Sequence, residues 1–219
     1  MLVILVNAMF DFFDVEQNSP EWYNLRAGKF TSSNAGKVMA NIGKAFGEPA
    51  KKYAVNIAIE QITGNPISSE YSNVHMERGH EQEPIARSLY EDQLFCDVDN
   101  GGFFGSEFIG CSPDGLVGKD GVIEIKSVIA SVHFNNIKRG GVDPAYKWQC
   151  ICNLLFTGRE WIDFVSYCSE FPIDNQLYIY RMEKTGLEEE FNKVVSRVSD
   201  FKRLVDETRS IILEAGKLK

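Results

Sequence analysis

Two acidic residues and a lysine lie close together in the sequence, around a short turn. Asp114, expected at the end of one strand, precedes the turn cluster at 118–121, and Glu124 and Lys126 follow it. Alternate residues of a β-strand point to the same side, so Glu124 and Lys126 share a face, and a hairpin brings Asp114 beside them. Two carboxylates suit Mg²⁺ or Mn²⁺, and an adjacent ammonium can orient a water molecule or offset charge on a phosphate oxygen. The pattern therefore indicates metal-dependent hydrolysis of a phosphodiester, as in a nuclease.

The same residues also fit a simpler interpretation. A surface hairpin can carry Glu124 and Lys126 on a solvated face with no chemical role, and short patterns of this kind often occur by chance. The strand alternates in either case, because Ile123 and Ile125 share one face while Val122 shares the other with Glu124. The rest of the chain has to decide between the two interpretations.

Length and composition predict one intracellular α/β domain. The 219 residues can form a substantial core, and no Gly-, Ser- or Pro-rich linker divides the chain. We therefore expect a single domain over 1–219. The apolar run 1–13 lacks a basic start and a small-residue cleavage site and is too short to span a bilayer, so we expect neither a signal peptide nor a membrane anchor.

Net charge and cysteine content argue against several classes of protein. The formal net charge of −8 argues against a protein that coats DNA nonspecifically, but not against a nuclease, which can concentrate positive charge in one groove. The five cysteines are odd in number and form no C-x-x-C pair. We therefore expect reduced, mostly buried thiols rather than disulfides or a zinc site.

Hydrophobic periodicity predicts a layered α/β core. Helices are expected from 31, from 49 to 64, and over 75–95, 146–156 and 187–215, and strands within 102–127 and over 161–167 and 176–182. The helix over 75–95 is expected to bend at Pro84 and to bury Ile85, Leu89 and Phe95. The last helix carries an amphipathic stripe that is expected to dock on the core, formed by Phe191, Val194, Val198, Phe201 and Val205.

Several short motifs occur together in one order along the chain. They are Trp22-Tyr23-Asn24-Leu25-Arg26-Ala27-Gly28, Thr31-Ser32-Ser33, Gly79-x-x-x-Glu83, Cys111-Ser112-Pro113-Asp114-Gly115, Glu124-Ile125-Lys126 and Gln149. In this order they resemble bacteriophage lambda exonuclease and the YqaJ-type viral recombinase nucleases, over about 15–180. The resemblance implies the PD-(D/E)XK fold, an α/β fold with a central mixed β-sheet flanked by helices. The first 14 residues would be an extension of unknown role.

The resemblance also implies roles for the charged residues. Asp114 and Glu124 would bind the metal together with the backbone carbonyl of Ile125, and Lys126 would position the attacking water. The cofactor would be one or two Mg²⁺ ions per site, with Mn²⁺ as a possible substitute.

Two further polar residues would complete the catalytic set. Glu83 would hold a metal-bound water, and Gln149 would lie near the scissile phosphate. From the residues alone, Glu83 also fits a glutamate on a helix surface, and Gln149 fits a buried hydrogen-bonding residue.

Arg26 and Ser33 have the chemistry of an anion pocket. A guanidinium can grip a terminal phosphate with two hydrogen bonds, and a helix start near Ser33 offers backbone N–H groups. In the related exonucleases such a pocket captures the 5′ phosphate. The alternatives are a surface ion pair for Arg26 and a helix cap for Ser33.

Met76 could act as a wedge between strands, although an ordinary core methionine is the simpler interpretation.

Taken together, the resemblance implies a Mg²⁺-dependent 5′→3′ exonuclease. It would degrade the 5′-phosphorylated strand of linear double-stranded DNA to mononucleotides and leave 3′ overhangs for single-strand annealing. It further implies a ring-shaped homotrimer and a single-strand annealing protein as partner, in the cytoplasm of a host cell and encoded by a phage or prophage. The alternatives are a PD-(D/E)XK endonuclease, a Cas4-like exonuclease and a catalytically silent DNA-binding scaffold.

Overall fold

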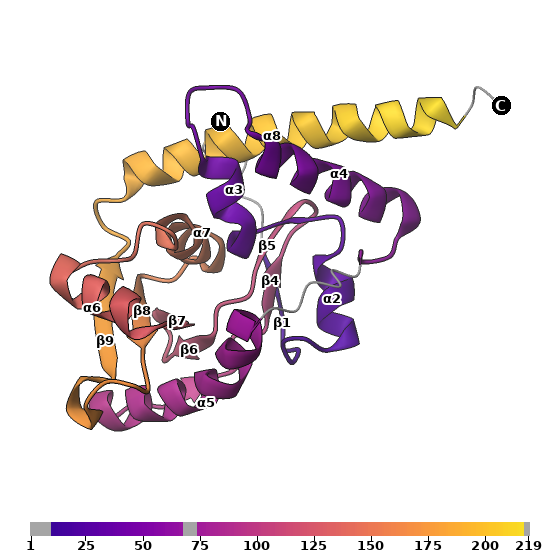
Figure 1. The fold of residues 1–219 in the computed structure, drawn as a ribbon. Helices are drawn as coiled ribbons and strands as arrows, with labels where there is room; N and C mark the ends of the chain where they lie inside the picture. The colour runs from indigo at the N-terminus through magenta and orange to yellow at the C-terminus, as the bar shows by residue number, and fades with distance from the viewer. Residues whose placement is uncertain (1–9, 68–73, 217–219) are drawn as a thin grey trace.

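Two mixed β-sheets surrounded by helices make up the computed structural model, which describes residues 10–67 and 74–216 (Figure 1). Of residues 74–77 and 80, only the helical backbone is described. The larger sheet has the order β3-β6-β7-β8-β9, formed by Val98–Asp99, Gly115–Val117, Gly121–Ser127, Trp161–Tyr167 and Leu177–Glu183. The smaller sheet has the order β1-β4-β5-β2, formed by Asp11–Phe13, Phe103–Gly105, Ile109–Cys111 and Phe30–Thr31.

Strand β7 lies at the centre of the larger sheet and carries the predicted site. It pairs antiparallel with β6 and parallel with β8 over its full length. Its residues alternate as predicted: Ile123 and Ile125 pack toward Ala86 and Tyr90 of helix α5, while Val122 packs toward α7. Glu124 therefore faces α7 from within the sheet.

Helices cover both faces of this sheet (Figure 1). The described helices are α2 (Pro20–Arg26), α3 (Ala35–Met39), α4 (Glu48–Thr63), α5 (Val74–Leu94), α6 (Ala130–Arg139), α7 (Lys147–Thr157) and α8 (Glu188–Ala215), with single 3₁₀ turns η1 (Ser32–Asn34) and η2 (Ile173–Asn175). Of these, α5, α6 and α7 contact the larger sheet. Helices α6 and α7 form the crossover between the parallel strands β7 and β8, and α7 packs on the face opposite α5.

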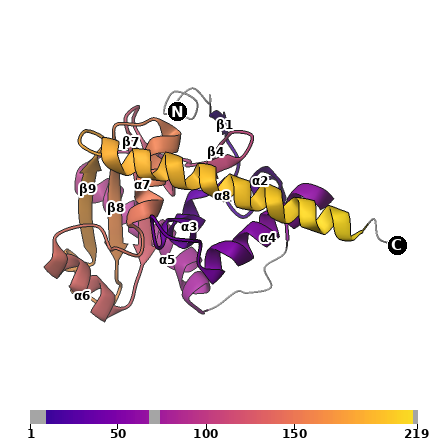
Figure 2. The same ribbon diagram turned by 90° about the horizontal axis from the view of Figure 1, so that it is seen from above.

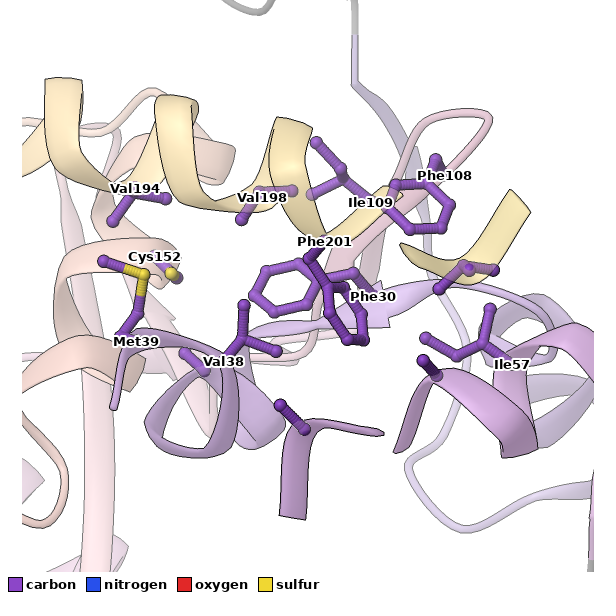
Figure 3. Close-up of a cluster of buried hydrophobic side chains, with 14 of the residues drawn as sticks. Phe30, Val38, Met39, Ile57, Phe108, Ile109, Cys152, Val194, Val198 and Phe201 are labelled. Atoms are coloured by element: carbon purple, nitrogen blue, oxygen red, sulfur yellow. The ribbon is translucent and has the colours of Figure 1, made fainter. Parts of the chain in front are cut away.

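The long helix α8 crosses α7, α3 and α4, as the view from above shows (Figure 2). The predicted stripe docks on the core: Val194, Val198, Phe201 and Val205 are buried. Phe201 points from α8 toward Phe30 and Val38, with 6.1 Å between the ring centroids of Phe201 and Phe30 (Figure 3). The amphipathic pattern thus correctly predicted an intramolecular contact.

Two burial predictions for the helix over 75–95 are wrong. Ile85 is 50% exposed and Phe95 is 96% exposed. The stripe that faces the sheet is instead formed by Ala86, Leu89 and Tyr90, so Ile85 is rotated away from it by one position. Phe95 follows the last residue of α5 and has a left-handed backbone, with φ of 52°. The helix therefore ends before Phe95, and the Phe95 side chain does not lie on the face of α5 that packs on the sheet.

Local structure around the site also differs from the prediction. Asp114 precedes β6 rather than ending a strand that pairs in the same sheet, because β5 and β6 belong to different sheets. The helix expected from 31 is a 3₁₀ turn followed by only five helical residues in α3. Helices α2 and α6 were not predicted, and β1 lies within the first 14 residues.

In the described chain all five thiols are free, and all but the partly buried Cys96 are buried, as expected of their apolar segments. Within the described residues, no helix has both the length and the apolar composition needed to cross a membrane.

Candidate active site

Glu124 is the most deeply buried carboxylate of the predicted site, with no exposed surface. Two amides from successive turns of α7 donate hydrogen bonds to it: Gln149 Nε2 to Oε1 at 2.5 Å and Asn153 Nδ2 to Oε2 at 2.7 Å. The ammonium of Lys126 forms an ion pair with the same Oε1. Glu124 is thus held from two elements, strand β7 and helix α7.

Asp114 is attached to the same hairpin by two backbone contacts. Its N–H donates to the carbonyl of Ile123 at 3.1 Å, and its Oδ2 accepts from the N–H of Ile125 at 2.6 Å. Arg87 of α5 donates to the backbone carbonyl of Asp114. These contacts fix the buried Asp114 side chain beside the strand that carries Glu124, as the sequence predicted.

Lys126 is mostly buried, and its side chain is 22% exposed. Its Nζ lies 5.3 Å from the centroid of the Tyr146 ring. Burial lowers the pKa of Lys126, but the charges of Glu124 and Asp114 outweigh this effect and the net pKa is raised. Lys126 therefore stays cationic at neutral pH.

The carboxylates of the site hold protons more tightly than isolated acids do. Burial, and then the charge of Asp114, raises the pKa of Glu124 to about 8, against the opposing effects of Lys126 and Asn153. Burial also raises the pKa of Asp114. Glu83 of α5 is partly buried, and burial followed by the charge of Asp114 raises its pKa to about 7. Three acidic groups, from α5, from β7 and from the segment just before β6, therefore share one electrostatic environment.

The donor set fits a hard divalent cation. A divalent cation would offset the repulsion between these buried carboxylates once they are deprotonated, and carboxylate oxygens are the ligands that Mg²⁺ prefers. Oδ1 of Asp114 accepts no hydrogen bond from a described residue. Among residues 10–67 and 74–216, no group of three or more His, Cys, Asp or Glu side chains is gathered closely enough to bind a metal. Asp114 and Glu124 are therefore the carboxylate pair that could hold a cation, and Glu83 is a third acidic group that the charge of Asp114 reaches.

Arg26 and Ser33 lie together in a second polar cluster. Nη2 of Arg26 donates to Ser33 Oγ at 3.1 Å, and its Nη1 donates to Ser112 Oγ at 3.4 Å. The guanidinium stacks on Trp22, 4.0 Å from the ring centroid, and Trp22 Nε1 donates to the same Ser112 oxygen at 2.8 Å. Burial lowers the pKa of Arg26.

The charge of Arg26 is not paired with a carboxylate among the described residues. No ion pair between described residues includes it. A partly buried cation beside hydroxyl groups is suited to an anion. Ser112 connects the two clusters, because it precedes Asp114 by two residues. Ser33 lies in the η1 turn and does not cap a helix, since neither η1 nor α3 has a side-chain cap.

Sequence reasoning missed several residues of the site. Asn153 is the second amide on Glu124, and its spacing of four residues from Gln149 on a helix was the signal that could have identified it. Arg87 stands four residues after Glu83 on α5 in the same way. No local signal singles out Ser112 as the link to Arg26. The predicted wedge, Met76, lies outside the residues whose side chains are described.

Comparisons with known proteins identify the family to which this chain belongs. The family model described as YqaJ-like viral recombinase domain matches residues 21–160. Two crystal structures of the alkaline exonuclease LHK-Exo from Laribacter hongkongensis, one of them with dAMP, are 32% and 33% identical. They cover 92% of this chain and 100% of their own, with TM-scores of 0.79 and 0.80. No curated protein matches the chain.

A third structure is a phage related exonuclease from Haemophilus somnus 129PT, which is 16% identical with a TM-score of 0.64. The match covers 87% of this chain and 99% of its own. At this identity it supports the fold alone. The mixed sheets with flanking helices therefore form the PD-(D/E)XK fold of alkaline exonucleases. The chain belongs to the YqaJ-like viral recombinase domain family and is an enzyme homologous to exonucleases.

Proposed function

We propose that this protein is a metal-dependent 5′→3′ exonuclease that degrades the 5′-phosphorylated strand of linear double-stranded DNA to mononucleotides. The observation that carries the proposal is the link through Ser112 between an uncompensated Arg26 and the carboxylates of Asp114 and Glu124. A strand whose 5′ phosphate binds Arg26 would present its first phosphodiester to the carboxylates. The related LHK-Exo was crystallised with dAMP, a mononucleotide, which is consistent with this product.

Asp114 and Glu124, with the carbonyl oxygen of Ile125, would bind Mg²⁺ or Mn²⁺, one or two ions per site. When bound, Mg²⁺ supplies a more acidic water and stabilises negative charge at the phosphate. Gln149 and Asn153 hold the Glu124 carboxylate in one orientation through its two oxygens, so that it is ready to act as a ligand.

Lys126 and Glu83 would act on the water and the proton. The ammonium of Lys126, positioned by Glu124 and Tyr146, orients the attacking water and offsets charge on a phosphate oxygen. Glu83, whose pKa is about 7, can accept a proton from water near neutral pH. Gln149 would also approach the scissile phosphate.

Arg26 and Ser33 would select the strand end. Bidentate hydrogen bonds from Arg26 and one from Ser33 favour a dianionic 5′ phosphate over a neutral 5′ hydroxyl. Stacking on Trp22 keeps the guanidinium in place when the pocket is empty. Cleavage would leave a new 5′ phosphate on the shortened strand, which can enter the same pocket.

For the whole protein we propose a single catalytic domain over 1–219 that forms a ring-shaped homotrimer. A ring would retain DNA despite the net charge of −8. The single-strand annealing protein of a phage or prophage would be the partner that receives the 3′ overhang, in the host cytoplasm.

The test is digestion of linear duplex DNA in Mg²⁺, with separate labels at the 5′ phosphate and at the 3′ end and with closed circular DNA alongside. We expect release of 5′ mononucleotides, a persistent 3′ single strand and an intact circle. Asp114→Asn and Glu124→Gln should abolish release, whereas Asp120→Asn, in the exposed turn of the same hairpin, should not. Cutting of the circle would indicate an endonuclease instead, and no cleavage of any DNA would indicate a DNA-binding scaffold.

A further inference from the structure

A cavity of about 440 Å³ lies beside Lys126 and shares no lining residue with the Arg26 cluster. This volume falls within the range of roughly 300–1,000 Å³ that small-molecule sites occupy. Its lining includes Glu83 and Lys126 of the proposed catalytic set, and continues along the chain through Ser127 and Val128. The cavity therefore extends from the proposed catalytic residues along the chain that follows β7.

Arg78 of α5 lines this cavity and has a buried donor without an acceptor among the described residues. Its Nη2 donates to the backbone carbonyl of Ser127 at 3.2 Å, which fixes the guanidinium against the end of β7. Its Nε is buried and has no hydrogen-bond partner in the described part of the chain. No ion pair within the described chain includes Arg78. A buried N–H without an acceptor is unfavourable, and an anionic oxygen in the cavity would satisfy it.

The remaining lining is apolar or aromatic. Ile129 and Val132 form an aliphatic wall, and the Tyr146 ring lies on the side of Lys126. Ile129 is 43% exposed, so part of this aliphatic wall is open to solvent. Aliphatic and aromatic surfaces accept the face of a nucleobase without regard to its sequence. The cavity thus combines an anion-binding side with a base-binding side.

Within the proposed function, on which this step rests, the 5′ phosphate lies at Arg26 and the scissile phosphate at Asp114 and Glu124. The digested strand then has to continue past Lys126. We infer that the cavity binds the second nucleotide of that strand, on the 3′ side of the scissile bond, and that Arg78 binds the phosphate between the second and third nucleotides. Arg78 is therefore a substrate-binding residue that holds the strand on the far side of the reaction from Arg26.

The test uses linear duplexes in which one phosphate of the digested strand is replaced by an uncharged methylphosphonate, either between nucleotides 2 and 3 or between nucleotides 5 and 6. The readout is single-turnover release of the first mononucleotide. For the parent protein, the neutral 2–3 linkage should slow release by about 10-fold or more, as expected for the loss of one charge-assisted hydrogen bond. The 5–6 linkage should have a smaller effect.

Arg78→Gln keeps a donor for the Ser127 carbonyl but removes the charge. This variant should release the first mononucleotide slowly from the natural duplex. Making the 2–3 linkage neutral should lower its release rate by less than about a further 2-fold, because the charge that the linkage would meet is already gone. Arg209→Gln, on the exposed surface of α8, should behave like the parent protein. Independent, multiplying effects of the variant and the neutral linkage would overturn the inference.

Three further outcomes are decisive. If Arg78→Gln does not fold, the parent protein alone provides the test: a loss confined to the 2–3 linkage supports the subsite, and an equal loss at both linkages contradicts it. If no linear duplex releases mononucleotides, the proposed function fails and this inference fails with it. Release without any effect of the 2–3 linkage overturns the inference alone.

Discussion

At the scale of single residues, the candidate site consists of a few largely buried charged groups on one hairpin. Lys126 forms the ion pair with Glu124, and the two carboxylates reach it from different positions in the sequence. Because these groups are largely removed from water, each one depends on the others for charge balance. Single substitutions here should therefore affect chemistry much more than similar changes in the nearby turn.

Replacing Lys126 by Met should lower the rate of DNA cleavage by about 100-fold or more, because the positioned ammonium is lost while the apolar part of the side chain is kept. Single-turnover cleavage in Mg²⁺ measures this loss. Lys119→Met, in the exposed turn of the same hairpin, is the matched control and should retain the parent rate. A Lys126→Met protein that cleaves within 3-fold of the parent rate would remove Lys126 from the mechanism.

Metal binding should strengthen as the pH rises. The pKa of Glu83 is about 7 and that of Glu124 is about 8, both above the ordinary value of 4.5, so protons compete with a cation at pH 6 and are largely lost by pH 9. The same shifts mean that the metal-free fold loses stability as the pH rises from about 4.5 through 8, since the folded state binds the protons more tightly.

Both effects can be read from thermal unfolding. Addition of Mg²⁺ should raise the Tm by more at pH 9 than at pH 6, and Glu124→Gln should reduce this increase at pH 9. An increase in Tm that is equal at the two pH values would show that the titration of these carboxylates does not control metal binding.

Arg26→Ala should abolish the discrimination between 5′-phosphorylated and 5′-hydroxyl ends. The expected loss is about 10-fold or more on phosphorylated DNA and little on hydroxyl ends, because only the phosphate can accept the charge-assisted hydrogen bonds. Initial rates on the two substrates measure it, with Arg209→Ala as a surface control. If Arg26→Ala still prefers phosphorylated ends, the anion pocket lies elsewhere.

At the scale of elements, the site depends on how β7, α7 and α5 pack. The i, i+4 pair Gln149 and Asn153 reaches Glu124 only because α7 crosses the face of the sheet where Val122 is also buried. From the sequence, the alternation of β7 and the stripe of α8 were predictable, since each follows from a regular period. The clustering of Asp114, Glu124 and Lys126 followed from the turn between them.

What could not be predicted arises from contacts between distant segments. The division of the predicted strand region into two sheets depends on pairing with β1, β2 and β3, whose short sequences show no period. The exposure of Ile85 depends on which face of α5 meets the sheet, and the amphipathic pattern of that helix is weak. The connection of Arg26 to Ser112 spans 86 residues, and no local motif encodes it.

The docking of α8 should contribute strongly to stability. Phe201 is fully buried between α8 and the core, with Tyr53 stacked on it at 5.5 Å and Phe30 at 6.1 Å. Phe201→Ala should lower the free energy of unfolding by about 3–5 kcal/mol, because it leaves a large cavity. Urea denaturation measures the loss. Ile211→Ala on the same helix, at a position 68% exposed, should change it by less than about 0.5 kcal/mol.

At the scale of the whole molecule, charge and processivity have to be reconciled. A protein with a net charge of −8 gains little from general attraction to DNA, so a monomer that releases its product should also release its substrate readily. A closed ring would retain the duplex by topology, with each new 5′ phosphate passing to an Arg26 pocket. Helix α8 extends past the rest of the fold at its C-terminal end, and exposes Ile211 and Leu213 there (Figure 1).

The proposed trimer predicts two linked results. Sedimentation equilibrium should give three times the chain mass of 24.7 kDa. Digestion that has already begun should continue after excess unlabelled DNA is added, because an encircled duplex cannot exchange by simple dissociation. A dilution that converts the protein to monomers should make digestion sensitive to the added DNA. If monomers digest long duplexes just as persistently, the ring is not the source of processivity, and retention must come from the contacts of a single active site with the strand.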